Sequence, residues 1–176
     1  MYFYLVGTNH RNQLLGCKDG DGRSMEFKCY LSNLCDIESI DLLAEELSEE
    51  ALKLLKATGS VVRQLATEHR IKHIFCDPNS DQRRELGIPK PEELKSKFGY
   101  GRCLKPNQQA KMEAEERKYW PIREDFWLDK VSAITANKCL FVLGPDHVDS
   151  FSVLLSNRGF NTEIKIHKWD IQPFMK

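Results

Sequence analysis

Short apolar runs alternate with amphipathic segments along this chain. A nearly continuous apolar run occurs at 2–7, and further strand candidates rich in apolar residues occur at 40–47, 71–77 and 139–144. Such runs are typical of strands that are covered on both faces, as in a parallel sheet. The segment 161–169 instead alternates apolar and polar positions, which predicts a last strand at an edge of the sheet.

Between these runs, apolar residues recur at the spacing of helix turns. The pattern predicts helices over 25–37, from Ser48 onward, and over 61–70, 107–119, 121–135 and 147–159. Ser48 precedes two acidic residues, which is a typical helix start, and Pro121 suits a first helical position. The apolar residues expected to face inward from the helix at 121–135 are Ile122, Phe126, Trp127, Val131 and Ile134.

Alternating strands and helices predict one α/β domain over residues 1–176, with a largely parallel central sheet flanked by helices. A length of 176 residues suits a single core. Residues 88–106 contain three prolines and two glycines. We expect them to form a lid-like loop inserted in this domain, with a short helix at 91–97.

The balance of acidic and basic residues bears on whether the protein binds nucleic acids. The chain has 26 Lys and Arg against 26 Asp and Glu, so its formal net charge is zero and no nucleic-acid partner is expected. No apolar run reaches the roughly 18 residues of a membrane span, and the N-terminus lacks the basic start of a signal peptide. The six cysteines are widely spaced, which predicts reduced thiols. We therefore expect a cytoplasmic protein that binds no membrane.

The residues that follow the strands carry the candidate chemistry. In open parallel sheets, ligands bind outside the carboxyl ends of the strands. The predicted strands deliver His10, Glu45 with Glu46, Asp77, and Asp146 with His147 to these ends. A glycine precedes each histidine by three residues, which lets the chain turn tightly and approach a ligand.

Each of these residues also has a purely structural interpretation. His10 can be a surface histidine, and the two glutamates can be the acidic start of the next helix. Asp77 precedes a proline and can cap a turn, and Asp146 can cap the helix that follows it. The shared position after four different strands favours a site. If side chains alternate along the strand, only one glutamate faces the crevice, and we expect Glu45.

Imidazole and carboxylate groups can bind zinc, manganese or iron, or they can act together as a base and an acid. Arg123 lies one turn into the helix at 121–135. It is either a surface arginine paired with Asp125 or Glu116, or an inward arginine that neutralises the rim carboxylates or holds a substrate anion.

At these residues the chain resembles the TraB/PrgY/Tiki family, whose superfamily includes the erythromycin esterases and the haem-binding ChaN proteins. LVGTNH at 5–10 is similar to the opening G-x-x-H motif, and the segment from Cys139 to Lys165 resembles the closing strand, G-x-x-H and helix. IREDFWLDKV resembles the arginine-bearing helix. The closest likeness is to small bacterial members, although Asp146 replaces a residue that is usually small.

The resemblance implies a metal- or histidine-dependent hydrolytic centre. His10 and His147 match the motif histidines, Glu45 or Glu46 the acidic residue after the second strand, and Arg123 the helix arginine. The sequence therefore predicts a hydrolase that acts on a small molecule or peptide and uses a divalent ion (Mn, Zn, Fe or Co). The expected metal ligands are His10, Glu45, Asp146 and His147, and the expected catalytic residues are Glu46, Asp77 and Arg123.

The alternative is a non-catalytic module of the same fold. In that case the same rim would hold a small ligand, haem or a peptide without turnover. A lid-like loop at 88–106 suits either class, because lids close on substrates and on ligands alike.

Overall fold

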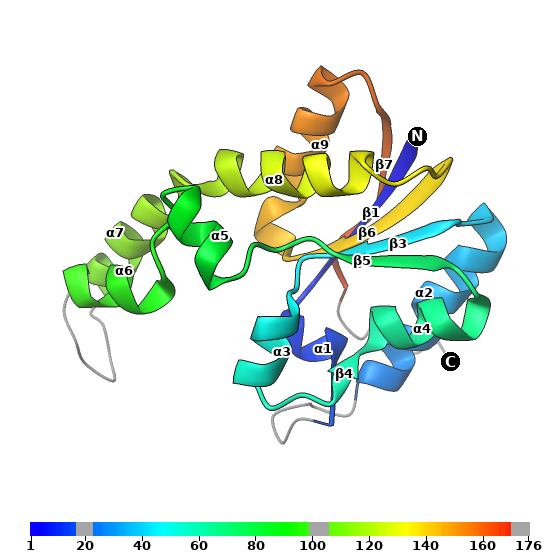
Figure 1. The fold of residues 1–176 in the computed structure, drawn as a ribbon, viewed down its shortest axis with the longest axis horizontal. Coiled ribbons are helices and arrows are strands. Elements are labelled where there is room, and N and C mark those ends of the chain that lie inside the picture. The colour runs from blue at the N-terminus through cyan, green and yellow to red at the C-terminus, as the bar shows by residue number, and fades with distance from the viewer. Residues whose placement is uncertain (17–22, 99–105, 170–176) are drawn as a thin grey trace.

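Five parallel strands form the central sheet of the computed structural model, which describes residues 1–16, 23–98 and 106–169 (Figure 1). Each neighbouring pair of strands is parallel. In spatial order the strands are β5 (Lys72–Phe75), β3 (Leu42–Glu45), β6 (Lys138–Leu143), β1 (Tyr2–Thr8) and β7 (Asn161–Trp169). The prediction of one α/β domain with a parallel central sheet is confirmed for the described residues.

Helices cover both faces of this sheet (Figure 1). α8 (Trp120–Ser132) and α9 (Val148–Asn157) pack on one face, and α2 (Ser24–Glu38) and α4 (Val61–His69) pack on the other. Strand side chains alternate between the two layers. Leu42 and Ala44 belong to the core beneath α8 and α9, whereas Leu43 belongs to the core beneath α2 and α4. Burial of these two apolar faces is the main force that holds the layers together.

The strand order creates a crevice at the carboxyl edge of the sheet. The chain runs from β1 to β3, and these two strands are not neighbours in the sheet. β6, which comes later in the chain, lies between them. Such a reversal of strand order places loops on either side of a shared opening. Among the described strands β7 pairs with β1 alone, so the prediction of a last strand at the edge is confirmed.

Short elements surround this opening. They are α1 (His10–Gln13), β2 (Leu14–Leu15), α3 (Glu49–Leu54), β4 (Gly59–Ser60) and the 3₁₀ turn η1 (Pro145–His147). β2 and β4 form an antiparallel pair that the hydrophobic pattern did not predict. The predicted start of a helix at Ser48 is confirmed, because the Ser48 hydroxyl accepts a hydrogen bond from the Ala51 N–H (3.1 Å).

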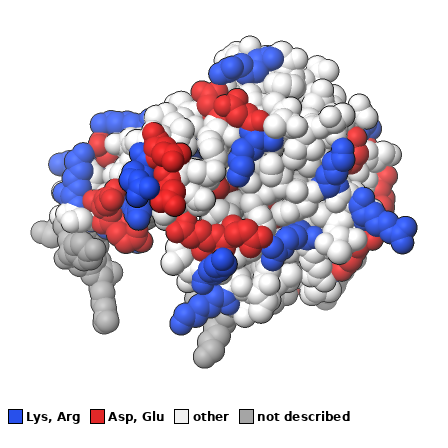
Figure 2. Space-filling model, in the orientation of Figure 1, with Lys and Arg blue, Asp and Glu red and all other residues white. Residues whose placement is uncertain are grey.

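Three helices project from the sheet as an arm (Figure 1). They are α5 (Ser80–Glu85), α6 (Pro91–Phe98) and α7 (Pro106–Arg117). The short helix expected at 91–97 within the lid-like segment 88–106 is confirmed as α6. Residues 99–105 of this segment lie outside the described part of the chain. Charged side chains of both signs crowd this arm (Figure 2). None of the described helices is long and apolar enough to cross a membrane.

Candidate functional site

A cavity of about 530 Å³ opens at the carboxyl edge of the sheet. Four of its lining residues come from strand ends: Thr8 ends β1, and Glu46, Asp77 and Gly144 closely follow β3, β5 and β6. The strands are parallel, so their ends meet at one edge. The cavity volume is within the range of small-molecule sites, roughly 300–1,000 Å³.

The guanidinium of Arg123 occupies the centre of the site. Its Nη2 donates to Glu46 Oε1 (2.8 Å) and Asp77 Oδ1 (2.7 Å), and its Nε also donates to Asp77 Oδ1 (3.1 Å). Nη1 donates to His147 Nε2 (3.3 Å). Burial lowers the pKa of Arg123, but the two carboxylates raise it by more, so the pKa lies above its ordinary value. Arg123 is therefore an inward, charged arginine.

Glu46 is a buried carboxylate whose two oxygens both accept hydrogen bonds. Arg123 bonds one oxygen, and the backbone N–H of Gly144 donates to the other (2.6 Å). Burial raises the pKa of Glu46, whereas the charge of the Arg123 guanidinium lowers it, and the net shift is downward. Glu46 therefore stays ionised and ties the end of β3 to the end of β6.

Asp77 lies between two arginines. Arg83, from α5, donates from Nη2 to Asp77 Oδ2 (2.8 Å), while Arg123 and the indole N–H of Trp127 (3.3 Å) donate to Oδ1. Burial raises the pKa of Asp77, but Arg123 and Arg83 lower it by more. Asp77 thus connects the arm, α8 and the strand edge at one carboxylate.

His147 forms a dyad with Glu124 on α8. Its Nδ1 lies 2.7 Å from Glu124 Oε1, and the Ser150 hydroxyl donates to the same oxygen (2.6 Å). A carboxylate can only accept at this distance, so Nδ1 carries the proton and Nε2 of the neutral ring is an acceptor. Trp120 and Trp127 pack against the imidazole at centroid distances of 4.3 and 5.0 Å. The ring is fixed in position, tautomer and orientation.

His10 faces the same carboxylate from the opening. Its side chain is 45% exposed, and its Nε2 lies 4.0 Å from Glu46 Oε1, to which His147 Nε2 lies at 3.8 Å. The buried side chain of Gln13 contacts His10 Nδ1 (3.3 Å). Both motif histidines therefore approach the same oxygen of Glu46, with His10 open to solvent and His147 buried.

The structure places Glu45 elsewhere. Its carboxylate accepts from the Ser60 hydroxyl (2.5 Å) and lies 2.7 Å from His73 Nε2, on the face of the sheet covered by α4. Glu46 has the same alternation phase as Leu42 and Ala44, which face α8. Glu46 rather than the expected Glu45 therefore reaches the cavity. Asp146 lines the cavity but is exposed.

The predicted metal ligands do not form a set that fits a divalent ion. Both ring nitrogens of the predicted ligand His147 are engaged, by Arg123 and Glu124. The guanidinium also bonds the predicted catalytic residues Glu46 and Asp77, so it holds the position where a cation would lie. Glu45 is on the other face. Within the described ranges, no group of three or more His, Cys, Asp or Glu side chains is arranged to hold a metal ion. We therefore derive no chemical step through a metal.

Sequence reasoning missed Glu124, Arg83 and Trp120. The signal for Glu124 was its spacing: it lies three residues before Trp127 and seven before Val131, so a helix that buries both of these also buries Glu124. The prediction that Ile122 faces inward is wrong, because Ile122 is 39% exposed. The buried face of α8 thus begins with two charged residues, Arg123 and Glu124, and continues with Trp127, Leu128 and Val131.

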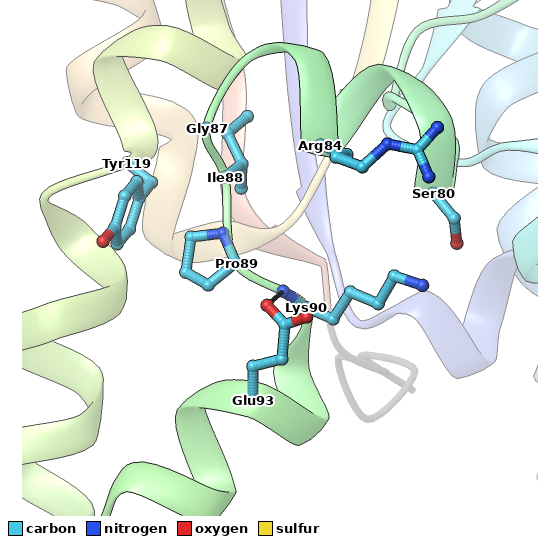
Figure 3. Close-up of a pocket in the computed structure, with 8 residues that line it drawn as sticks. All are labelled: Ser80, Arg84, Gly87, Ile88, Pro89, Lys90, Glu93 and Tyr119. Atoms are coloured by element: carbon cyan, nitrogen blue, oxygen red, sulfur yellow. Dashed lines mark hydrogen bonds between the residues drawn. The ribbon is translucent and has the colours of Figure 1, made fainter.

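A second cavity, of about 380 Å³, lies on the arm (Figure 3). Several of its polar groups have partners within the chain: both the N–H and the hydroxyl of Ser80 donate to Glu50, Arg84 pairs with Asp81, and Glu93 accepts from the Lys90 N–H. Its described lining residues include no histidine, and their one carboxylate, Glu93, is exposed, so the strand-end cavity is the better candidate.

Comparisons with known proteins leave the family of this chain open. No protein-family model matches it, and neither the curated proteins nor the solved structures contain a match. The resemblance to the TraB/PrgY/Tiki family therefore stays a prediction from its motifs.

Proposed function

We propose that this cavity is the active site of a hydrolase in which a histidine, rather than a metal ion, activates the attacking water. The observation that carries the proposal is the Glu124–His147 dyad, whose Nε2 lies beside the Arg123 guanidinium at the end of the cavity. A carboxylate that fixes Nδ1–H and leaves Nε2 as an acceptor is the arrangement that general-base histidines use. The motif resemblance supports the same class.

His147 would take the proton from the water as the water oxygen attacks the substrate carbonyl carbon. In the free site the single lone pair of His147 Nε2 accepts from Arg123 Nη1 (3.3 Å), so the attacking water must replace this hydrogen bond by inserting between the two atoms, where it accepts from Nη1 and donates to Nε2. Arg123 would then stabilise the negative charge that develops on the carbonyl oxygen. Asp77 and Glu46 hold the guanidinium in place for this role.

His10 is suited to protonate the leaving group. Its Nε2 lies 4.0 Å from Glu46 Oε1, the same oxygen that His147 Nε2 approaches, and its exposed ring can exchange protons with solvent. The carbonyl–leaving-group bond breaks as His10 supplies a proton to the departing atom. His147 loses its proton to solvent and His10 regains one, so both rings return to their starting states.

Water is the proposed nucleophile because the cavity offers no activated alternative. Among its described lining residues, Thr8 carries the only side-chain hydroxyl, none is a cysteine, and the Thr8 oxygen accepts a hydrogen bond from Asn12 (3.0 Å). Thr8 is not bonded to either histidine in the described contacts. A direct displacement therefore predicts single-phase product release without a burst.

The test is hydrolysis of a panel that includes p-nitrophenyl acetate, γ-butyrolactone and a dipeptide p-nitroanilide. We expect His147→Asn to lower kcat by about 10²–10⁴-fold, because it removes the base. Glu124→Gln should lower kcat by a similar factor, because without the carboxylate the imidazole proton can lie on Nε2, where the lone pair is needed. His69→Asn is the matched control, since His69 hydrogen-bonds Ser32 between α2 and α4. Equal activity of His147→Asn and His69→Asn, with both folded by circular dichroism, would contradict the proposal.

The metal content of protein purified without chelator tests the remaining prediction of a divalent ion. Near-stoichiometric metal that both His10→Ala and His147→Ala lose would restore the metal-dependent mechanism. Activity that survives exhaustive chelation supports the histidine mechanism. Binding of panel compounds without any turnover would instead favour the non-catalytic module.

A further inference from the structure

The cavity has two unlike walls. His147, Arg123 and Trp120 form one side, from η1 and α8. Another part of the lining is apolar and comes from β2, the residue pair after β3, and α3 with its C-cap residue. Its residues are Leu14, Leu47, Ala51 and Leu55.

The apolar wall is a packed surface with an open end. Leu14 and Leu47 are 5% and 4% exposed, and with Leu52 they form a small hydrophobic cluster of their own, apart from the two main cores. At the mouth, however, Leu55 is 48% exposed and the neighbouring Leu54 is 75% exposed. The wall thus has a rigid base and an outer leucine that leaves apolar surface in water.

This wall has no role in the proposed chemistry, because it carries no polar side chain. It lies in the same cavity as His147 and Arg123, so any molecule whose carbonyl reaches those groups also meets it. An apolar group on the substrate would cover the exposed leucine surface. A wholly polar substrate would leave that surface in water and gain nothing from it.

We propose that the Leu14–Leu47–Leu55 wall is a subsite for an aliphatic chain, and that the substrates are small carboxylic esters with such a chain on one side of the scissile bond. This inference rests on the proposed hydrolase function. Water adds to the carbonyl carbon, the acyl C–O bond breaks, and the products are a carboxylic acid and an alcohol. The geometry does not depend on whether the chain belongs to the acid or the alcohol.

Two ester series distinguish a chain on the acid part of the ester from a chain on the alcohol part. One is p-nitrophenyl acetate, butyrate and hexanoate, and the other is methyl, butyl and hexyl acetate followed by acid release. Each buried methylene favours binding about fourfold, so we expect kcat/KM to rise by tenfold or more along one series. A rise in the first series places the chain on the acyl side, and a rise in the second places it on the alcohol side. Flat profiles in both series, with measurable turnover, would overturn the inference.

Leu54 and Leu55 provide a matched pair of variants. They are adjacent and exposed, but only Leu55 lines the cavity. Leu55→Asn should reduce the ratio of long-chain to short-chain kcat/KM by about tenfold, Leu55→Met should restore it, and Leu54→Asn should leave it at the wild-type value. Equal effects of Leu54→Asn and Leu55→Asn would overturn the assignment of the wall.

A binding measurement separates this inference from the hydrolase proposal. Hexanamide and acetamide present the same carbonyl group with and without the chain, and their binding to the full chain can be followed by heteronuclear NMR. If no ester is hydrolysed, the hydrolase proposal fails. Hexanamide binding that is lost in Leu55→Asn and kept in Leu54→Asn would still support the subsite, whereas hexanamide that binds no better than acetamide would overturn it.

Discussion

Two adjacent glutamates, Glu45 and Glu46, lie on opposite faces of the sheet. Glu46 bonds Arg123 and Gly144 in the cavity, and Glu45 bonds Ser60 and lies against His73 beneath α4. One Glu45 oxygen, Oε2, is buried without a hydrogen-bond partner among the described residues. A single step along the strand therefore separates a residue of the proposed site from a residue of the opposite layer.

This difference predicts opposite effects of the same substitution. Glu46→Gln removes the charge that holds Arg123 and faces both histidines, so ester hydrolysis should fall by about 10–100-fold. Glu45→Gln keeps the shape and lies outside the cavity, so kcat per folded molecule should stay within twofold of wild type. The measurement is kcat on active-site-normalised protein. A larger loss in Glu45→Gln than in Glu46→Gln would contradict the assignment.

Residue types and positions in the sequence were enough to nominate His10, Glu46, Asp77, Arg123 and His147. They were not enough to identify Glu124, because a glutamate beside an arginine on a helix is usually a surface residue. Its role depends on η1 presenting His147 to α8, a contact between residues 23 positions apart. No local pattern encodes that contact.

At the scale of elements, β1 and β7 approach so closely that a side chain cannot fit at Gly7. A Cβ added there would lie 1.8 Å from the His167 backbone oxygen and 2.7 Å from Val148 Cγ2. The pairing of β1 with β7 also shifts register around Val6. Gly7 is therefore required by strand packing, whereas its position before His10 had suggested a tight turn toward a ligand.

We expect Gly7→Ala to lower the free energy of unfolding by about 2–3 kcal/mol, because β7 must move away from β1. Gly59→Ala in β4 is the control, since a Cβ there meets its nearest atom, Arg63 Nη2, at 3.5 Å, an ordinary contact. Urea unfolding followed by tryptophan fluorescence measures both variants. Equal free energies of unfolding for Gly7→Ala and Gly59→Ala would contradict this prediction, because β7 could then shift to make room for the added methyl group without loss of stability.

At the scale of the whole molecule, Arg123 joins β3, β5, α8 and η1 through Glu46, Asp77 and His147. Arg83 adds α5 and hence the arm. The pKa values of Glu46 and Asp77 are lower in the folded protein than their ordinary values, which lie near 4. Their ionised side chains therefore stabilise the folded state at pH values above 4, and this stabilisation is lost as the pH falls through the lowered pKa values. Between pH 7 and pH 5 these two groups should leave the stability of the wild type unchanged.

Removal of the guanidinium should reverse this dependence. In Arg123→Met, burial remains and the main opposing charge is gone, so the pKa of Glu46 should rise above its ordinary value. The variant should be about 3–5 kcal/mol less stable than wild type at pH 7, and this gap should narrow as the pH falls towards 4.5 and Glu46 takes up a proton. Urea unfolding at pH 7.5, 6.0 and 4.5 measures the gap.

Arg84→Met is the control, because its pair with Asp81 is exposed on both sides. Arg123→Lys keeps the positive charge beside Glu46, so its stability gap to wild type should not narrow between pH 7.5 and 4.5, and it can be measured even if Arg123→Met does not fold. A gap that stays constant with pH in Arg123→Met would show that Glu46 is not stabilised by Arg123.

The sequence by itself determined the α/β class, most helices and strands, and the edge at which polar residues collect. Strand and helix periods are local, and parallel strands bring their carboxyl ends to one edge whatever their order. Only the tertiary structure decided that Glu46 rather than Glu45 enters the site, and that Glu124 orients His147. Both outcomes depend on which face of the sheet α8 covers, because a hydrophobic pattern specifies which side chains are buried but not which layer buries them.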